Sequence, residues 1–258
     1  MLRGQTLVTN KLSTTCKWCY STLEANVKFC TQCGAELTRN KLEDRDKSIT
    51  LVISFYIAFL VFAVISYFLL SEYPNHFYID LGVEIGFAAL VLFFSSLDYK
   101  KIRALYLLPK LDWKLWVFTF VFPIFSAVLV NIFVDSINGW LGVENNSNYY
   151  LEYIYYENPL LWSFIFVAVF PPIFEELAFR GFLFNVLRKI SSDRLTIIAT
   201  AFLFALVHFS FISFLWIFPF GLVLGYLRSK YETIWLGVII HFIHNFSIIV
   251  FDYIKIHY

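Results

Sequence analysis

The stretch PPIFEELAFRGFLF, residues 171–184, decides the fold class because it places three charges inside a strongly apolar run. Predominantly apolar residues extend from Leu160 to Glu175 and Glu176, and they continue on both sides of Arg180. A charged side chain at membrane depth costs roughly 3 kcal/mol or more, so intramembrane charges are rare and usually functional. The stretch therefore predicts a membrane helix that carries part of a functional site.

The composition indicates a membrane protein as a whole. Of the 258 residues, 59% are hydrophobic and only 15% are charged, against about 25% charged residues in a soluble domain. The mean hydropathy is +0.68, and several apolar runs reach the roughly 20 residues that span a bilayer as a helix. The sequence therefore predicts an all-α polytopic membrane protein, and it shows no basic patch typical of nucleic-acid binding.

Turn residues and charges divide the apolar part into membrane spans. We expect seven transmembrane helices from the lengths of the apolar runs. The spans that can be placed cover residues 49–70, 79–97, 114–135, 159–187 with a bend, 194–210, 212–228 and 233–251. The first run is too long for the apolar core of a signal peptide, so it is interpreted as a membrane anchor.

The distribution of basic residues predicts the orientation in the membrane. Lys and Arg occur in loop 98–113, in the connection 188–194 and in the turn 229–232, whereas loops 71–78 and 136–158 contain Glu but neither Lys nor Arg. Because cytoplasmic loops are rich in Lys and Arg, we expect the N-terminus in the cytoplasm. The expected location is a multi-pass protein of the cell membrane, and the many Phe, Ile, Tyr, Lys and Asn residues suggest a bacterial source.

All four cysteines lie in a short polar segment before the first span, at Cys16, Cys19, Cys30 and Cys33. Two C-x-x-C pairs at this spacing are typical of a structural zinc ribbon, in which four thiolates close a tetrahedral site. Gly34 allows the tight turn that such a cysteine pair needs. Two disulfides in an exported segment are the alternative, but a cytoplasmic location favours reduced, zinc-binding cysteines.

These features divide the chain into three parts. We expect a zinc ribbon at residues 1–37, a charged linker at 38–48 and a transmembrane domain at 49–258. The linker is assigned because its sequence, TRNKLEDRDKS at 38–48, is almost entirely polar and precedes the first apolar run.

Glu175 and Glu176 are expected to have different environments. Pro171 and Pro172 disfavour helix at the residues before them, so a new half-helix is predicted near Pro172, with both glutamates in or just beyond its first turn. Glu176 and Arg180 are four residues apart, which puts them on one helix face where they can pair. Glu175 lies about 100° around the helix, where it is freer to act as a base. A purely structural salt bridge is the alternative, but it leaves Glu175 unexplained.

Two later spans carry the other polar candidates. Phe204 and His208 share a face of one span, and His241 and Asn245 share a face of the last span, with His244 beside them. Taken singly, each is explained by a packing histidine or a hydrogen bond between membrane helices. Several such groups in separate spans of so apolar a chain favour one common site.

These residues resemble the motifs of the CPBP intramembrane protease family, also called the Abi or CAAX-protease family. Residues 175–180 are similar to its E-E-x-x-x-R motif, 204–208 to F-x-x-x-H and 241–245 to H-x-x-x-N, in the family order and in separate spans. The resemblance covers roughly residues 159–251, the motif core of the transmembrane domain. It implies about eight spans, so the expected fold is an all-α membrane domain of about seven to eight transmembrane helices. The zinc ribbon lies outside it, as an accessory segment.

The resemblance implies an intramembrane endopeptidase that hydrolyses a peptide bond of a membrane-associated protein or peptide. The catalytic residues that it implies are Glu175, Glu176, Arg180, His208, His241 and Asn245. In this picture Glu175 activates water with help from His208, and His241 and Asn245 stabilise the oxyanion, a chemistry with large known contributions to rate. One carboxylate with two histidines is also the ligand set of a catalytic zinc, so a metallo-type mechanism stays open beside the favoured glutamate type.

Two other functions fit part of the sequence. A catalytically silent membrane scaffold or immunity protein of the same fold would keep the spans, but loss of motif residues is its expected mark. A proton-coupled transporter would use intramembrane Glu and His as a relay, but the chain shows no internal repeat of the kind found in many transporters. The expected partners are the lipid bilayer, the membrane-associated substrate and, through the zinc ribbon, a cytoplasmic protein; no nucleic acid is expected.

Overall fold

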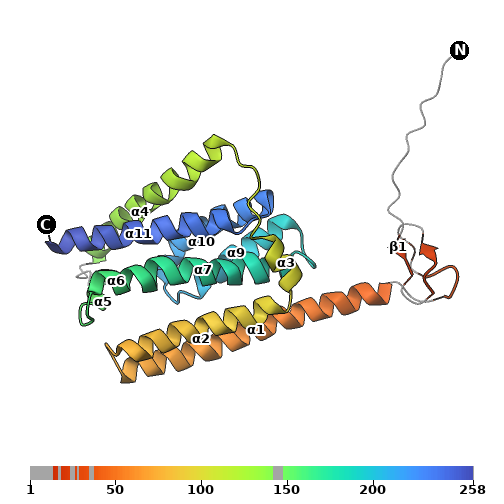
Figure 1. The fold of residues 1–258 in the computed structure, drawn as a ribbon, viewed down its shortest axis with the longest axis horizontal. Coiled ribbons are helices and arrows are strands. Elements are labelled where there is room, and N and C mark those ends of the chain that lie inside the picture. The colour runs from red at the N-terminus through yellow and green to blue at the C-terminus, as the bar shows by residue number, and fades with distance from the viewer. Residues whose placement is uncertain are drawn as a thin grey trace, which may run out of the picture. The chain divides into compact units, whose positions relative to one another are not determined.

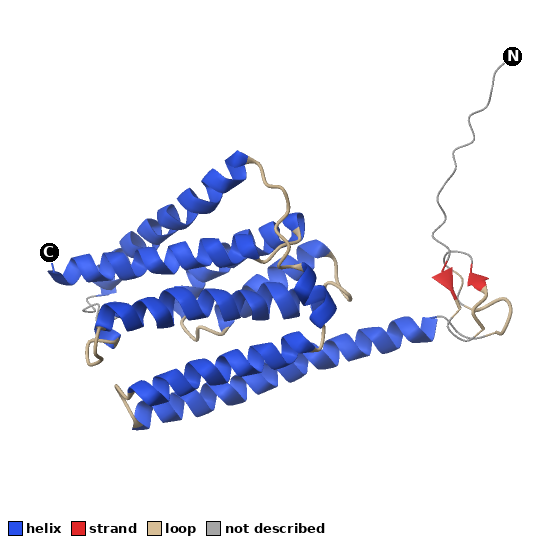
Figure 2. Cartoon of the chain, viewed as in Figure 1, coloured by secondary structure: helices blue, strands red, loops and turns tan. Residues whose placement is uncertain are grey.

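The computed structural model describes residues 14–16, 19–23, 27, 29–34, 38–141 and 148–257 (Figure 1). The chain divides into two compact units, residues 1–51 and 52–258. Helices dominate the described part, and the strands form a single two-stranded sheet near the N-terminus (Figure 2). The all-α class predicted for the membrane part is confirmed.

The first unit contains the sheet and the start of the first long helix. β1 (Thr14–Thr15) pairs antiparallel with β2 (Thr22–Leu23), with Thr14 opposite Leu23. α1 (Thr38–Glu72) begins where a charged linker was expected, so residues 38–48 are helical and continuous with the first membrane span. The boundaries of the predicted zinc ribbon and linker stay a prediction.

Six helices are long and apolar enough to cross a membrane. They are α1, α2 (Phe77–Ser96), α4 (Trp113–Leu141), the helical segment Pro159–Leu187, α10 (Phe211–Tyr231) and α11 (Trp235–His257). Two short helices, α3 (Tyr99–Ala104) and α5 (Tyr149–Glu152), lie in the loops before and after α4. The described part of the chain is thus a multi-pass bundle with six candidate spans rather than seven or eight.

The difference arises at the span predicted for residues 194–210. α9 (Asp193–Leu206) has 14 residues and therefore rises about 21 Å, which is short of the roughly 30 Å of bilayer hydrocarbon. The turn that follows contains Phe209 in the left-handed backbone region, at φ 49°. Because Val207 and Phe209 are apolar and apolar residues continue on both sides of the turn, hydropathy alone merges this turn with the helix.

α9 and α10 form an antiparallel hairpin. The two helices pack along each other, and Ser229 near the end of α10 donates a hydrogen bond of 3.0 Å to Asp193 at the start of α9. The hairpin therefore returns the chain to the end from which it entered. It also places His208, in the connecting turn, at the opposite end of α9 from Asp193.

The segment Pro159–Leu187 is helical without a break. It consists of α6 (Pro159–Ser163), the π-helical η1 (Phe164–Val169), α7 (Phe170–Glu176), the π-helical η2 (Leu177–Leu183) and α8 (Phe184–Leu187). The expectation of a new half-helix near Pro172 is wrong, because the wider turn of η1 accommodates both prolines within a continuous helix. The glutamates therefore lie inside a long helix and gain nothing from a free helix N-terminus.

Aromatic packing attaches this segment to the first two spans. The rings of Phe55, Phe94 and Phe182, from α1, α2 and η2, lie with centroids 5.2 to 5.6 Å apart. Phe55 and Phe182 are almost fully buried, and such ring pairs add about 0.5–1.5 kcal/mol each beyond the area they bury. The segment that carries the glutamates is thereby held rigidly.

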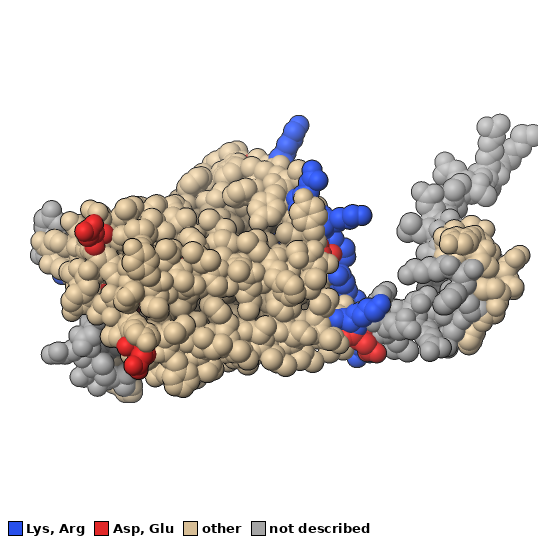
Figure 3. All heavy atoms as spheres, turned by 60° about the horizontal axis from the view of Figure 1, so that its bottom comes forward, with Lys and Arg blue, Asp and Glu red and all other residues tan. Residues whose placement is uncertain are grey.

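Charged side chains mark the two ends of the second unit. Figure 3 shows Lys and Arg side chains gathered at one end of the bundle and a largely uncharged surface between the ends. The basic end contains α3, the end of α8 and the end of α10, which are joined by a Lys189–Asp98 ion pair and an Arg188–Glu232 ion pair. We call this end of the bundle the basic end.

Candidate active site

Glu176 and Arg180 form a fully buried ion pair, as their spacing predicts. Arg180 Nη1 lies 2.7 Å from Glu176 Oε1, and the two side chains are 1% and 0% exposed. Arg180 Nη2 donates to the carbonyl of Gly221 at 3.3 Å, and the guanidinium lies 4.3 Å from the ring centroid of Phe204. The pair therefore ties α7 and η2 to both helices of the α9–α10 hairpin.

Two glycines make room for this pair. A Cβ atom at Gly237 of α11 would lie 2.4 Å from Glu176 Oε2, and one at Gly221 of α10 would lie 3.3 Å from Arg180 Nη2. A contact below 3 Å cannot be accommodated without a shift of the buried carboxylate. The backbones of α10 and α11 thus approach the pair closely from two sides, which leaves Glu176 no access to a substrate.

Glu175 faces a cavity, in contrast to Glu176. The cavity has a volume of about 540 Å³, and Glu175, Phe204, His208, His241, His244 and Asn245 are among its lining residues. Glu175 is 21% exposed, and its Oε2 lies 3.9 Å from His241 Nε2. His241 Nδ1 lies 3.4 Å from Glu176 Oε1, so the imidazole stands between the two carboxylates.

His208 occupies the turn after α9 and lines the same cavity. Its Nδ1 lies 2.9 Å from the carbonyl oxygen of Phe204, which leaves Nε2 as the ring nitrogen available to the cavity. The Phe204 ring packs edge-on against both imidazoles, with centroids 5.1 Å from His208 and 5.8 Å from His241. Phe204 therefore spaces the two histidines and also covers Arg180.

Asn245 has a structural partner that the sequence did not reveal. Its Nδ2 donates a hydrogen bond of 2.9 Å to the carbonyl oxygen of Val167. Residues 171 and 172 are both proline, so the backbone N–H groups that normally bond this carbonyl in an α- or π-helix are missing. Asn245 supplies the missing donor from α11 and holds η1 against it, while its second amide hydrogen remains free at the cavity.

The cavity extends from the glutamates toward the end opposite the basic end. Its other polar lining residues include Asp135, Tyr149, Glu152, Ser213, Asp252 and Lys255. Lys255 and Asp135 form an ion pair of 2.8 Å between α11 and α4, and the backbone N–H of Tyr149 donates to Asp252 at 2.9 Å. Burial, and then the nearby Asp252, raise the pKa of Glu152 in this region. The sequence predicted a functional role for none of these residues at the mouth of the cavity, because polar and charged residues are common at the ends of membrane spans.

The buried ion pair lies beneath the cavity, as a floor that Phe204 and His241 cover. Glu176 and Arg180 are not among its lining residues, and on their far side the Arg180 carbonyl accepts a hydrogen bond of 2.9 Å from Arg228 Nε. α11 begins beyond this floor, where the indole of Trp235 donates to the carbonyl of Tyr106 in the basic loop. Charged and aromatic side chains therefore separate the cavity from the basic end.

The described residues contain one group arranged to hold a metal ion, and it is the cysteine cluster. The Sγ atoms of Cys16, Cys19, Cys30 and Cys33 all lie within 4.8 Å of one another, and the shorter separations are 3.6 and 3.7 Å. Sulfurs around a tetrahedral zinc lie about 3.8 Å apart, whereas a disulfide has about 2.05 Å. The four thiols fit zinc, and the disulfide alternative does not fit.

The backbone around the cysteines supports this assignment. The Gly34 N–H donates to the carbonyl of Cys30 at 2.9 Å, and Tyr20 N–H donates to that of Cys16 at 2.8 Å. Gly34 adopts a left-handed φ of 71°, as the predicted tight turn requires. Glu175, His208 and His241 are not gathered in this way among the described residues.

A comparison with protein-family models relates this geometry to known proteins. Residues 157–247 match the family described as type II CAAX prenyl endopeptidase Rce1-like. The match covers a little over a third of the chain and includes all three motifs. No curated protein and no solved structure gives a significant match. In this membrane segment, the chain is similar to the Rce1-like CAAX prenyl endopeptidase family.

Proposed function

We propose that this protein is an intramembrane endopeptidase of the glutamate type. The observation that carries the proposal is the separation of two neighbouring carboxylates. Glu176 is locked in a buried ion pair, whereas Glu175 lines a cavity with His208, His241 and Asn245. One carboxylate is thus structural, and the other is free to take a proton from water.

Glu175 acts as the general base in this proposal. A cavity of about 540 Å³ has room for a peptide segment and a water molecule beside the carboxylate. Glu175 Oε2 makes no hydrogen bond to the protein, so the base is not occupied by a competing donor. His208 Nε2 assists by orienting the water, and a base positioned in this way contributes about 10²–10⁴-fold to rate.

His241 and Asn245 stabilise the oxyanion that forms when water attacks the peptide carbonyl. His241 lies between two carboxylates, and a ring N–H of its imidazole can donate a hydrogen bond to the oxyanion. Asn245 keeps one amide hydrogen for this purpose while the other holds Val167. Glu176 and Arg180 do not contact the substrate in this proposal. They are positioning residues that fix His241 and Phe204.

The substrate enters from the end opposite the basic end. That end carries the cavity mouth, while the buried ion pair separates the cavity from the basic end. By the positive-inside rule the basic end faces the cytoplasm, so the cleaved bond enters from the outer side or from the bilayer. The substrate class is therefore a membrane-associated peptide that reaches the outer half of the bilayer, and the cysteine cluster holds a structural zinc in the cytoplasm.

A cleavage assay with the purified full chain and membrane-embedded peptides tests the proposal. Glu175→Gln keeps the size of the side chain but removes the base, so turnover is expected to fall by about 10²–10⁴-fold with folding intact. Glu72→Gln, an exposed change at the end of α1, is the matched control and should cleave normally. Normal cleavage by Glu175→Gln would show that the constellation is structural and end the protease assignment.

A further inference from the structure

A second cavity lies at the basic end, apart from the candidate active site. It has a volume of about 520 Å³ and lies between α3, the end of α8 and the end of α10. Its polar lining residues are Lys101, Asn185, Arg188, Lys189, Arg228 and Glu232. Four cations thus surround one space that holds a single carboxylate, and the proposed protease chemistry uses none of them.

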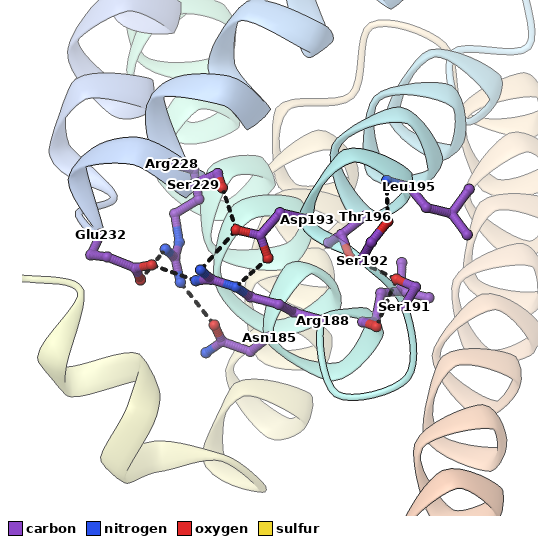
Figure 4. Close-up of polar contacts among 11 residues, drawn as sticks. Asn185, Arg188, Ser191, Ser192, Asp193, Leu195, Thr196, Arg228, Ser229 and Glu232 are labelled. Carbon is purple, nitrogen blue, oxygen red and sulfur yellow. Dashed lines mark hydrogen bonds and ion pairs between the residues drawn. The ribbon is translucent and has the colours of Figure 1, made fainter. Parts of the chain in front are cut away.

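Arg228 forms the inner wall of this cavity. It is only 3% exposed, and it donates from Nη2 to Asn185 Oδ1 at 2.8 Å and from Nη1 to Glu232 at 2.9 Å. Arg188 extends across the entrance, where Asp193 accepts two hydrogen bonds from it and Glu232 accepts one. Figure 4 shows how Arg188 runs between Asp193 and Glu232 while Arg228 reaches down to Asn185.

The network leaves hydrogen-bond donors and positive charge without partners. Asn185 is 8% exposed, and its Nδ2 is buried without a hydrogen bond while Oδ1 is held by Arg228. Lys101 forms no ion pair among the described residues, whereas Lys189 is paired with Asp98. Buried amide donors are almost always satisfied, so a purely structural network does not account for Asn185. An unpartnered donor beside an unneutralised lysine indicates an anionic ligand.

We propose that this cavity binds the phosphate group of an anionic phospholipid. Phosphate oxygens accept hydrogen bonds from Lys, Arg and amide donors, and basic pockets between membrane helices bind acidic lipid headgroups. Asn185 and Arg228 lie two and three residues from the ends of the candidate spans Pro159–Leu187 and Phe211–Tyr231, where a helix that leaves the bilayer reaches headgroup level. Lys101 and the Asn185 amide contact the phosphate, and Arg228 supplies its remaining guanidinium hydrogens.

Lipid binding here stabilises the active-site floor. Arg228 Nε donates to the carbonyl of Arg180, whose side chain forms the buried pair with Glu176. A phosphate that fixes Arg228 therefore also fixes η2, through two direct contacts. The bound lipid is expected to raise thermal stability, whether or not the protein cleaves peptides.

The test measures lipid binding rather than proteolysis, so its outcome is independent of the proposed function. The full chain is purified in neutral detergent, and native mass spectrometry and melting curves are recorded with phosphatidylglycerol, phosphatidylcholine or inorganic phosphate. Lys101→Gln removes the unpaired cation and is expected to weaken phosphatidylglycerol binding about fivefold. Lys100→Gln removes the same charge from the neighbouring position of α3, outside the cavity lining, and should bind as the unmodified protein does.

Asn185→Asp separates ligand binding from structure. The change keeps the oxygen that Arg228 bonds, so the fold is retained, but it replaces the free donor by a negative charge. We expect phosphatidylglycerol binding to fall at least about tenfold, because a carboxylate faces the phosphate. We expect phosphatidylcholine and inorganic phosphate to cause no shift in the melting temperature. Unchanged binding in both cavity variants, or an equal loss in Lys100→Gln, would overturn the site, and displacement of the lipid by equimolar inorganic phosphate would overturn its assignment to lipid.

Discussion

Two glutamate–arginine pairs with the same spacing occur in very different parts of this molecule. Glu176–Arg180 and Arg228–Glu232 are both four residues apart, with ion-pair distances of 2.7 and 2.9 Å, although Glu232 is the residue that follows the last turn of α10. In the first pair both side chains are at most 1% exposed, whereas Glu232 of the second is 53% exposed. The same spacing therefore serves two purposes, a buried support and a network that is open to solvent on the side of Glu232.

The energetic consequence follows from burial. Removing one partner of a buried pair leaves an uncompensated charge and costs about 3–5 kcal/mol, whereas an exposed pair contributes about 0–1 kcal/mol. The buried pair must also remain closed, because it forms the cavity floor, while the second pair can exchange partners with a ligand. This difference explains why a catalytic assignment fits one end of the bundle and a binding assignment fits the other.

The largest expected effect is the loss of the buried pair. Glu176→Gln removes the charge that compensates Arg180, so the free energy of unfolding in detergent should fall by about 3–5 kcal/mol. Glu232→Gln is the matched change in the second pair and should cost less, because the Glu232 side chain is 53% exposed and Arg228 keeps its hydrogen bonds to the Arg180 carbonyl and to Asn185. Chemical unfolding of both variants measures the difference, and equal costs would refute the contrast between the pairs.

A smaller effect is expected from crowding the buried pair. Gly237→Ala puts a Cβ atom 2.4 Å from Glu176 Oε2, and such overpacking costs about 1–3 kcal/mol. Gly82→Ala in α2 is the control, because nothing lies within 4 Å of its Cβ position and alanine favours helix. A melting temperature for Gly237→Ala at or above that of Gly82→Ala would mean that the carboxylate has room to move.

Variants at Asn245 separate its structural role from its proposed catalytic role. Asn245→Ala leaves the Val167 carbonyl without a donor, at a cost of about 1 kcal/mol in stability, and it removes an oxyanion donor, which should lower turnover by about 10²–10³-fold. Adding Pro171→Ala restores a backbone N–H four residues after Val167. The double variant should recover stability but not turnover; recovery of both would reassign Asn245 as a positioning residue only.

Sequence reasoning succeeded where the determining contacts are local. The Glu176–Arg180 pair follows from a four-residue spacing, and the cysteine cluster follows from two short motifs. It failed at Pro171 and Pro172, because the donor that rescues the helix lies 78 residues away in Asn245. It also failed at α9, because hydropathy does not distinguish a turn with apolar residues at 207 and 209 from a continuous helix. The Arg228 network stayed hidden for the same reason, since its contact with Arg180 spans 48 residues.

The smallest expected effect is the pH dependence of the exposed network. Hydrogen bonds from Arg188 and then Ser229 lower the pKa of Asp193. Partial burial by itself raises the pKa of Glu232, but hydrogen bonds from Arg188 and Arg228 lower it overall. A carboxyl group whose pKa is lowered on folding stabilises the protein above its unfolded pKa, about 4 for these residues, and loses that contribution as the pH falls through the folded value.

Melting curves between pH 7 and pH 3 therefore test the network against the buried pair. We expect the melting temperature to hold from pH 7 to about pH 5 and to fall below about pH 4 as Asp193 and Glu232 take up protons. Asp193→Asn has no carboxylate at this position to protonate. Its melting temperature should therefore be slightly lower at pH 7 and should fall less steeply as the pH is lowered. High salt should shrink the difference between the two proteins, because exposed charges are screened. An identical slope in both would mean that the ion pairs at the basic end contribute nothing to stability and that only the buried pair matters energetically.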